Sequence, residues 1–297
     1  MKHSVVMIVG GGPAGMTAAI QLRRYGFDPL VFESKRLGGL LWNANLVENY
    51  PGFPGGISGP ELVKKISQQF SHLGIRMKRQ QIERVDYDGE IFTVESKYQS
   101  FTCDVLVLAA GTKPNQFPSG LIPDEAASRV YYEVSDLADR CKASIAIIGA
   151  GDAAFDYALN LASWENEVMI FNRGTEIKAL PLLLDRVLKF SSITYYQNTS
   201  LNAVQSVEGK LQLGMVDVSG KTSYKVDALL GALGRSPTGP HRTERLSANL
   251  AHLQENGRLH LVGDLHNGIY RQTAIAVGDG LKAAMKIYQF LRGEDEQ

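Results

Sequence analysis

A glycine pattern that occurs twice constrains this 297-residue chain more than any other feature. The first copy directly follows the apolar, β-branched residues 5–9 and opens residues 13–25, which have a helix-forming composition. Residues 30–32 are a second short apolar run, and it ends at Glu33. The glycines have the spacing G-x-G-x-x-G and are Gly10, Gly12 and Gly15. The sequence therefore predicts a strand, a helix and a second parallel strand around a dinucleotide-binding turn.

Each residue type in this pattern has a physical role. The first glycine permits a tight turn, the second lets a pyrophosphate approach the backbone, and the third lets helix and strand pack closely. Pro13 and Ala14 then form the first helical turn, where a proline needs no N–H partner. The pyrophosphate would lie at this helix N-terminus, where free N–H groups and the helix dipole favour an anion. Glu33 stands where a carboxylate accepts hydrogen bonds from ribose hydroxyls.

The second copy follows the strand-like residues 145–148 and has the form G-x-G-x-x-A. Its residues are Gly149, Gly151, Asp152, Ala153 and Ala154. The step of 23 positions that leads from Gly10 to Glu33 leads here to Asn172, which is followed by Arg173. An arginine would attract a 2′-phosphate that a carboxylate would repel, and this favours NADPH over NADH. The alternative is that Arg173 is an ordinary solvated surface residue.

The repeat predicts an α/β fold with two Rossmann-like, three-layer ββα dinucleotide-binding domains. We expect the second domain at residues 113–231, inserted into a first domain formed by residues 1–112 and 232–297. Further signals are a helical capping box at Ser58 and Glu61, a hairpin turn at residues 88–89, a buried strand at residues 226–231 and a long helix at residues 271–291.

Composition excludes several classes of function. Lys plus Arg equals Asp plus Glu at 31 each, so no basic surplus points to nucleic acid. No run of about 18 apolar residues predicts a membrane span, and a cytoplasmic location is the default expectation. The two cysteines, Cys103 and Cys141, form neither a disulfide framework nor a metal-ligand cluster. We expect both to be small buried apolar residues, and we expect no metal site.

Together these motifs resemble the low-molecular-weight thioredoxin reductase family, which has the pyridine nucleotide-disulfide oxidoreductase type of fold and includes a branch of thioredoxin-reductase-like ferredoxin–NADP reductases. The resemblance covers nearly the whole chain. It rests on the two glycine motifs, the pair at residues 38–39, residues 47–53, the Gly-Asp pair at residues 263–264 and the Tyr-Arg-Gln-Thr-Ala run at residues 270–274. It implies that the first domain binds FAD, the second binds NADPH or NADH, and the protein is a homodimer.

The resemblance also implies the residues of each site. Those expected to bind FAD are Gly10, Gly12, Pro13, Ala14, Gly15, Glu33, Gly39, Leu40, Asn49, Gly111, Asp264, Arg271, Gln272 and Thr273. Those expected to bind NAD(P)H are Gly149, Gly151, Asp152, Ala153, Ala154, Asn172, Arg173 and Lys178. In the family the counterpart of Asn49 lies against the flavin, and the helix after residues 270–272 points its N-terminus at the flavin's pyrimidine edge, where it would stabilise negative charge. The family's basic nucleotide loop is reduced here to Arg173 and Lys178.

One departure from the family bears directly on function. Thioredoxin reductases carry a redox Cys-x-x-Cys shortly before the second glycine motif, whereas residues 132–137 here read Tyr-Glu-Val-Ser-Asp-Leu. A dithiol relay needs two adjacent sulfurs, so reduction of thioredoxin by that relay is not expected. The hypothesised reaction is hydride transfer from nicotinamide C4 to flavin N5, which requires no catalytic side chain.

Three functions remain open for this chain. The first is an NAD(P)H-dependent reductase of a one-electron carrier such as ferredoxin or flavodoxin. The second is direct reduction of a small-molecule acceptor, a quinone or a small disulfide, at an open flavin site. The third is a non-catalytic flavin-based redox sensor, against which the largely intact motif at Gly149 argues.

Overall fold

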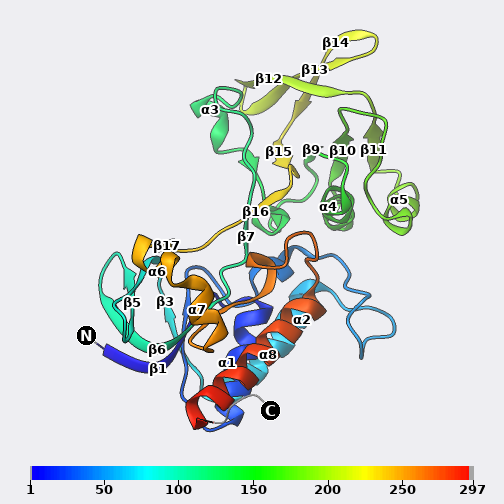
Figure 1. Ribbon diagram of the computed structural model, residues 1–297. Coiled ribbons are helices and arrows are strands. Elements are labelled where there is room, and N and C mark those ends of the chain that lie inside the picture. The colour runs from blue at the N-terminus through cyan, green and yellow to red at the C-terminus, as the bar shows by residue number, and fades with distance from the viewer. Residues whose placement is uncertain (1, 294–297) are drawn as a thin grey trace. The chain divides into compact units, whose positions relative to one another are not determined.

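The computed structural model describes residues 2–293, and the chain divides into two compact units (Figure 1). Unit 1 contains Met1–Trp42, Val47–Lys113 and Pro237–Gln297, and unit 2 contains Asn43–Leu46 and Pro114–Ser236. The chain leaves unit 1 within β7 (Thr112–Pro114) and returns to it within β16 (Arg235–Pro237).

The predicted boundaries between the two domains follow residues 112 and 231, whereas the observed ones follow residues 113 and 236. The first differs by one residue and the return by five. The return comes later because Ser236 Oγ donates to Asn115 Oδ1 at 2.7 Å, which keeps the start of β16 with unit 2. The sequence also gave no sign that Asn43–Leu46 would belong to unit 2.

Unit 1 is built on an eight-stranded sheet with the order β17-β4-β5-β6-β1-β2-β3, in which β18 also pairs with β6. Its strands are β1 (Lys2–Val9), β2 (Leu30–Glu33), β3 (Arg76–Arg79), β4 (Ile82–Tyr87), β5 (Phe92–Ser96), β6 (Ser100–Leu108), β17 (His241–Arg242) and β18 (Leu259–Leu261). The β4–β5 pair is antiparallel, which confirms the hairpin turn predicted at residues 88–89. The nine-residue β6 pairs antiparallel with β5 along its first half and parallel with β18 along its second.

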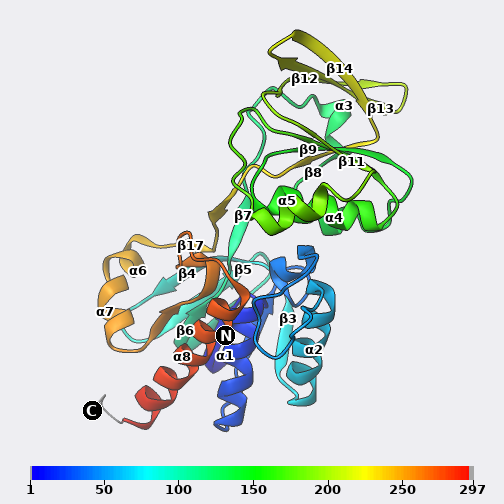
Figure 2. The ribbon, with the colours of Figure 1, turned by 90° about the vertical axis from the view of Figure 1, so that its right-hand side faces the viewer.

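Two layers cover this sheet, because side chains of successive strand residues point to opposite faces. Val6 and Ile8 belong to a core formed with α1 (Pro13–Arg24), α2 (Gly59–His72) and α8 (Thr273–Arg292). Met7 and Val9 belong to a second core, which includes the β4–β5 hairpin, α6 (Glu244–Ala248) and α7 (Leu250–Glu255). Figure 2 shows α6 and α7 apart from α1 and α8 in unit 1. The predicted three-layer α/β fold is confirmed.

The predicted capping box at the start of α2 is also present. The Ser58 side chain accepts a hydrogen bond from the Glu61 N–H at 3.3 Å and donates one to Glu61 Oε2 at 2.8 Å. The long C-terminal helix begins at Thr273, two residues later than predicted, and ends at Arg292. No helix within residues 2–293 is long and apolar enough to cross a membrane.

Unit 2 repeats the parallel pattern in a five-stranded sheet with the order β11-β10-β9-β15-β8, beside an antiparallel sheet with the order β12-β13-β14. The strands are β8 (Val130–Tyr131), β9 (Ser144–Ile148), β10 (Glu167–Phe171), β11 (Ile193–Tyr196), β12 (Ser200–Val207), β13 (Lys210–Asp217), β14 (Gly220–Val226) and β15 (Ala228–Gly231). The helices are α3 (Asp124–Ala127), α4 (Asp152–Ser163) and α5 (Pro181–Val187).

Two sequence predictions in unit 2 are wrong. Residues 226–231 are not one strand, because the chain changes sheets at Asp227. The Asp227 N–H donates to the Ser144 carbonyl at 2.7 Å and its carboxylate accepts from the Ser144 N–H, which directs β15 alongside β9. Cys141 is exposed, whereas Cys103 is buried as predicted. Cys141 precedes a surface turn in which Lys142 has φ 53° and donates to the Glu165 carbonyl.

Candidate dinucleotide sites

The turn at Gly10 is fixed by close packing. The Gly10 N–H donates to the Phe32 carbonyl at 2.8 Å, and the residue has φ +113°. A Cβ atom here would lie 2.2 Å from the Ala109 carbonyl oxygen, and one at Gly15 would lie 1.9 Å from the Gly10 carbonyl oxygen. Only glycine fits at either position, because backbone atoms cannot move aside as a side chain can.

Gly12 has the opposite surroundings. It is the N-cap residue of α1, and a Cβ atom on it would meet nothing within 4 Å. Pro13 occupies the first helical position, and Ala14 and Gly15 are buried behind it. The turn therefore leaves open space where the helix presents its unpaired N–H groups, and these residues fit a pyrophosphate.

Glu33 ends β2 beside this turn. One carboxylate oxygen accepts from the Gly11 N–H at 2.8 Å, and the other accepts from the Lys35 N–H at 2.7 Å. Ser34 Oγ also donates to Oε1, at 3.4 Å, whereas among the described residues Oε2 has the Gly11 N–H as its one donor. The carboxylate is therefore held in place, and Oε2 can still accept a hydroxyl hydrogen bond. Gly11 was not among the residues predicted from the sequence, although its N–H orients Glu33, the residue predicted to bind the ribose.

Two other segments of unit 1 lie beside the same turn. The Gly38 N–H donates to the Gly11 carbonyl at 2.8 Å, and a Cβ on Gly39 would lie 3.3 Å from Gly12 Cα. Leu40 follows in the short helix η1 (Gly39–Asn43). A Cβ on Gly263 would lie 3.0 Å from Ala14 Cβ, which places η3 (Gly263–Leu265), and Asp264 with it, next to the first turn of α1.

Two predicted flavin-contacting segments also meet. Asn49 Nδ2 donates to Gln272 Oε1 at 2.8 Å across 223 positions of sequence. Gln272 is the N-cap residue of α8, which begins at Thr273. The Arg271 N–H donates to the Ile269 carbonyl. Gly111, with φ +68°, accepts at its carbonyl from the Thr238 N–H at 3.0 Å, where the chain re-enters unit 1.

The second glycine motif repeats the first at the level of single hydrogen bonds. The Gly149 N–H donates to the Phe171 carbonyl at 3.0 Å, and a Cβ on Gly149 would lie 2.3 Å from the Ala232 carbonyl oxygen. Gly151 is the N-cap of α4, and a Cβ on it would meet nothing within 4 Å. Asp152, Ala153 and the buried Ala154 begin α4. The α4 N-terminus is therefore as open to a pyrophosphate as that of α1.

The loop after β10 differs from its counterpart in unit 1. Asn172 is buried, and its side chain donates to the Glu176 carbonyl and the Tyr195 hydroxyl, both at 2.9 Å. It also accepts from the Gly174 N–H at 3.1 Å. The side chain thus holds the loop from within and does not reach out as Glu33 does.

The two predicted cations lie on this loop. Arg173 is exposed. The Lys178 N–H donates to the Ala150 carbonyl at 3.0 Å, matching the bond of Gly38 in unit 1, while its exposed ammonium lies 4.0 Å from Glu176 Oε2. The Asp152 carboxylate accepts from the Leu180 N–H at 2.7 Å, so it helps to shape the end of the loop.

A partly buried ion pair joins Glu133, which precedes the second glycine motif in the sequence, to Arg235, near the end of unit 2. Arg235 Nη1 lies 2.9 Å from Glu133 Oε1, with side-chain exposures of only 17% and 16%. Asn43 donates from Nδ2 to the other Glu133 oxygen, and its own Oδ1 accepts from the Ser135 N–H at 3.1 Å. Burial raises the pKa of the neighbouring Tyr157 hydroxyl above its usual range. These groups are positioned by salt-bridge and hydrogen-bond contacts, and none of them is a thiol.

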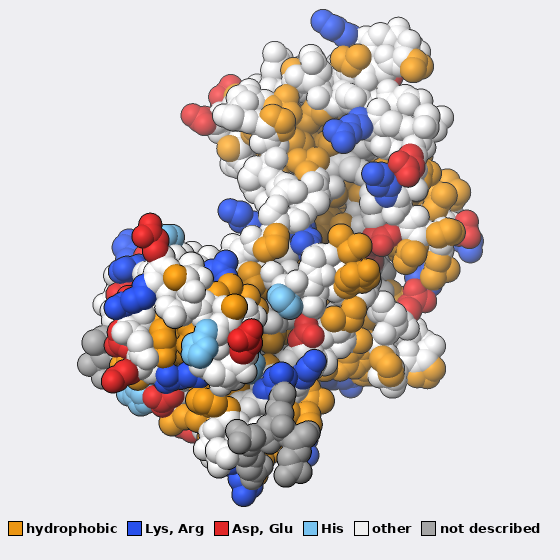
Figure 3. Space-filling view, in the orientation of Figure 1, with side chains coloured by type: hydrophobic (Ala, Val, Ile, Leu, Met, Phe, Trp, Pro, Cys, Tyr) orange, Lys and Arg blue, Asp and Glu red, His pale blue; other side chains and the backbone are white. Residues whose placement is uncertain are grey.

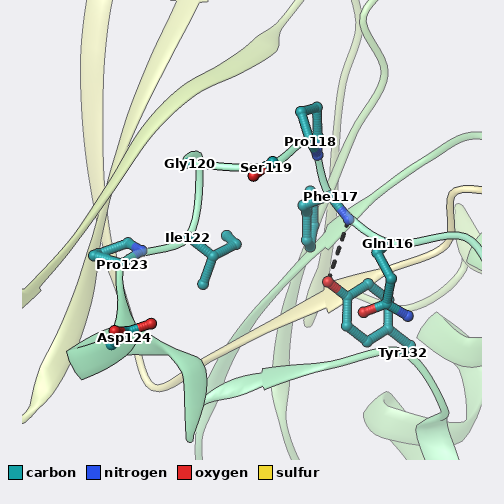
Figure 4. Close-up of a pocket in the computed structure, with 9 residues that line it drawn as sticks. All are labelled: Gln116, Phe117, Pro118, Ser119, Gly120, Ile122, Pro123, Asp124 and Tyr132. Carbon is teal, nitrogen blue, oxygen red and sulfur yellow. Dashed lines mark hydrogen bonds between the residues drawn. The ribbon is translucent and has the colours of Figure 1, made fainter.

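Unit 2 has a cavity of about 510 Å³, and one of its lining residues, Tyr132, directly precedes Glu133 in the sequence (Figure 4). It is formed by residues 116–120, Ile122, Pro123, Asp124 and Tyr132. The Tyr132 hydroxyl accepts from the Phe117 N–H at 3.2 Å, shown as the dashed line. No residue of the second glycine motif lines this cavity, so it is separate from the expected nucleotide position.

Two further properties concern surface charge and metals. On the face shown in Figure 3, acidic and basic side chains are interspersed over unit 1, in keeping with the formal net charge of +0. Within the described residues, no group of three or more His, Cys, Asp and Glu side chains could hold a metal ion.

Comparison with known proteins identifies related sequences and structures. Residues 4–272 match the family model described as pyridine nucleotide-disulphide oxidoreductase. Thioredoxin reductase from Chlamydia pneumoniae is 27% identical over 318 residues, covering 98% of this chain and 100% of that protein. Thioredoxin reductase from Mycolicibacterium smegmatis is 28% identical over 308 residues, with 98% and 97% coverage. The crystal structure of Lactococcus lactis thioredoxin reductase has a TM-score of 0.83 at 26% identity and covers 98% of this chain and 99% of that one.

Proposed function

Because this chain belongs to the pyridine nucleotide-disulphide oxidoreductase family, we propose that it passes electrons from NADPH through FAD to a one-electron carrier such as ferredoxin or flavodoxin, without a dithiol relay. The chain is an NAD(P)H-dependent flavoprotein oxidoreductase, and the thioredoxin reductase family that it resembles uses FAD and NADPH.

The observation that carries the proposal is that Glu133, in the stretch where the family that the chain resembles has its dithiol, forms an ion pair with Arg235. A dithiol relay needs one sulfur to attack and a second to resolve the mixed disulfide. Cys103 is buried in the core of unit 1, where desolvation raises its thiol pKa above its usual range, so it resists forming the reactive thiolate. Cys141 belongs to unit 2, so no two cysteines can act together within one unit.

The protein's contribution to the reaction is to position the cofactors. Bound FAD supplies the chemistry, because it accepts a hydride from NADPH and can release the electrons singly. The N-termini of α1 and α4 would bind the pyrophosphates, Glu33 and Asp264 would accept hydroxyl hydrogen bonds, and the N-terminus of α8 would favour negative charge beside it. Arg173 would contact the 2′-phosphate of NADPH, and Asn172 would shape the loop that presents it.

The second candidate, direct reduction of a quinone or small disulfide, is favoured by a different observation. Ile269 and Tyr270 are 86% and 70% exposed and directly precede the segment that contains Gln272. A planar apolar acceptor could pack against such side chains without a protein partner. The sensor hypothesis gains no support from the geometry, because the turn at Gly149 retains the packing seen at Gly10.

An acceptor screen with the FAD-bound protein tests the proposal. NADPH oxidation is followed with ferredoxin, flavodoxin, a quinone, a small disulfide and thioredoxin, each at low and high salt. We expect reduction of a one-electron carrier at a rate that falls as salt screens the encounter. Quinone turnover that is insensitive to salt would favour the second candidate, and stable nucleotide binding without turnover would favour the sensor.

The matched control is a variant without cysteines, Cys103→Ala with Cys141→Ser. Under the proposal this variant keeps the wild-type rate with the carrier, because no sulfur participates. Loss of turnover in Cys141→Ser alone would contradict the proposal, since Cys141 is exposed and its substitution leaves the core intact.

A further inference from the structure

We propose that Asp279, on the second turn of α8, is a positioning residue that sets the FAD site by holding the segment before α8 at two points, Gly263 and Asn267. One carboxylate oxygen, Oδ2, accepts from the Gly263 N–H at 3.1 Å and from Asn267 Nδ2 at 2.5 Å. Asp279 was not among the residues expected from the sequence to bind FAD, and in the structure it acts through Gly263 and Asn267. The inference depends on FAD binding alone and not on the electron acceptor.

Asp279 is anchored by the packing of α8 on α1. The next residue, Gly280, is buried against α1, and a Cβ on it would lie 2.2 Å from the Ala14 carbonyl oxygen. The backbones of α1 and α8 therefore touch at the helical turn that follows Gly12. This contact fixes the base of the Asp279 side chain relative to the α1 N-terminus, where the pyrophosphate would lie.

The Asp279 carboxylate binds the backbone at Gly263. Gly263 directly precedes Asp264, has φ +69° and packs against Ala14 Cβ. A hydrogen bond to its N–H fixes the peptide between Val262 and Gly263, one residue before Asp264, which is expected to bind FAD. A carboxylate is a stronger acceptor for this N–H than a neutral group, because the bond is charge-assisted.

Through Asn267, the same carboxylate also fixes the segment that leads to the α8 N-terminus. The Gly263 carbonyl accepts from the N–H groups of His266 and Asn267 at 2.9 and 3.2 Å, and the Asn267 carbonyl accepts from the Tyr270 N–H at 2.9 Å. Asn267 therefore relays the position of Asp279 to the segment that ends at Gln272. Because one oxygen serves both donors, its loss would release Asp264 and the α8 N-cap together.

The test compares three variants of the full-length, FAD-bound protein: Asp279→Ala, Asp279→Asn and Asn267→Ala. FAD release on dilution is measured from the rise of free-flavin fluorescence, and the shape of the 450 nm absorption band reports the flavin's surroundings. Asp279→Ala removes the acceptor, and we expect FAD binding weakened by roughly tenfold to a hundredfold, with an altered band. Asp279→Asn keeps an acceptor oxygen for both donors but loses the charge assistance, so FAD binding should weaken by only about threefold to tenfold. Asn267→Ala removes one of the two donors and should fall between them.

A matched control separates positioning from general loss of stability. Asp86 is another unit 1 carboxylate, and it accepts from Thr243 Oγ1 at 2.5 Å and from Arg245 Nη2 at 2.6 Å, just after β17, the end strand of the sheet. Asp86→Ala should lower the melting temperature but leave FAD release and the 450 nm band unchanged. The inference is overturned if Asp279→Ala binds FAD like wild type, if Asp86→Ala releases FAD as readily as Asp279→Ala, or if Asp279→Asn fails to restore binding.

Discussion

Asn49 and Gln272 are joined by a hydrogen bond of 2.8 Å from Nδ2 to Oε1, although 223 positions separate them in sequence. Asn49 lies in the loop between η1 and α2, and Gln272 caps α8. The bond therefore brings together two residues that sequence motifs had assigned to the flavin separately.

A double-mutant cycle measures this bond. Asn49→Ala and Gln272→Ala should each weaken FAD binding by about threefold to tenfold, the usual effect of losing one neutral hydrogen bond. The double variant should lose less than the product of the two, with a coupling energy of about 1 kcal/mol. FAD titration of the four proteins gives the coupling energy, and strictly additive losses would show that the two side chains act independently.

The two kinds of glycine in the first motif should behave differently. Gly10→Ala forces a Cβ to within 2.2 Å of a carbonyl oxygen at φ +113°, so it should destabilise unit 1 by roughly 3 kcal/mol or more. Gly12→Ala places its Cβ in open space, so the free energy of unfolding should change by only about 1 kcal/mol. FAD binding, in contrast, should weaken about a hundredfold. Thermal unfolding and FAD titration separate the two effects. Tight FAD binding by Gly12→Ala would contradict the assignment of the pyrophosphate site.

The stability of unit 2 should depend on pH because of Asp156. Burial raises the pKa of this carboxyl from 3.8 to about 6, although the N–H groups of Asn45 and Leu46 donate to it. The folded state therefore binds more protons than the unfolded state between these values, and stability falls as pH rises from about 4 to about 6. At about 1.4 kcal/mol per pKa unit, the loss is on the order of 3 kcal/mol.

The variant Asp156→Asn isolates this contribution. Its side-chain oxygen still accepts a hydrogen bond from the Asn45 N–H, which lies 2.9 Å from Asp156 Oδ2, but it does not titrate. The stability difference between wild type and variant should therefore change across pH 4 to 6 and stay constant above about pH 7. Denaturant unfolding of both proteins measures this difference, and a difference independent of pH would refute the account.

Nucleotide preference should depend on Arg173 and Gly174. Arg173→Ala removes the exposed guanidinium and should weaken NADPH binding about tenfold relative to NADH. A Cβ on Gly174 would meet nothing within 4 Å, so Gly174→Arg is tolerated and should increase the preference for NADPH. KM values for both nucleotides check this, and equal effects of Arg173→Ala on NADPH and NADH would mean that no 2′-phosphate contact exists.

Local patterns predicted most of the fold, because their causes lie within short segments. The capping box at Ser58, the hairpin after Tyr87 and both glycine turns depend on residues adjacent in sequence. The change of sheet at Asp227 was not predicted, since it depends on a hydrogen bond to Ser144, 83 positions away. The exposure of Cys141 was also missed, because composition says nothing about where a turn lies.

In the candidate site, too, features within short segments were predicted and contacts between distant residues were not. The motifs indicated the segments that surround the α1 N-terminus, but not the contacts that align them. Asp279 and Gly280 form part of a Gly-Asp-Gly run whose purpose emerges only from the packing of α8 on α1. Asn172 was selected by its distance from Gly149, and the structure shows that its side chain is bonded within its own loop.

The central claim is that electrons pass from NADPH through FAD to an acceptor without a thiol, and anaerobic stopped-flow spectroscopy tests it most directly. The FAD-bound wild type and the cysteine-free variant are mixed with NADPH, followed at 450 nm, and then mixed with ferredoxin or flavodoxin. The account predicts rapid bleaching in both proteins, followed by reoxidation by the carrier at the same rate in each. Absence of bleaching with FAD bound, or reoxidation that requires the cysteines, would contradict it.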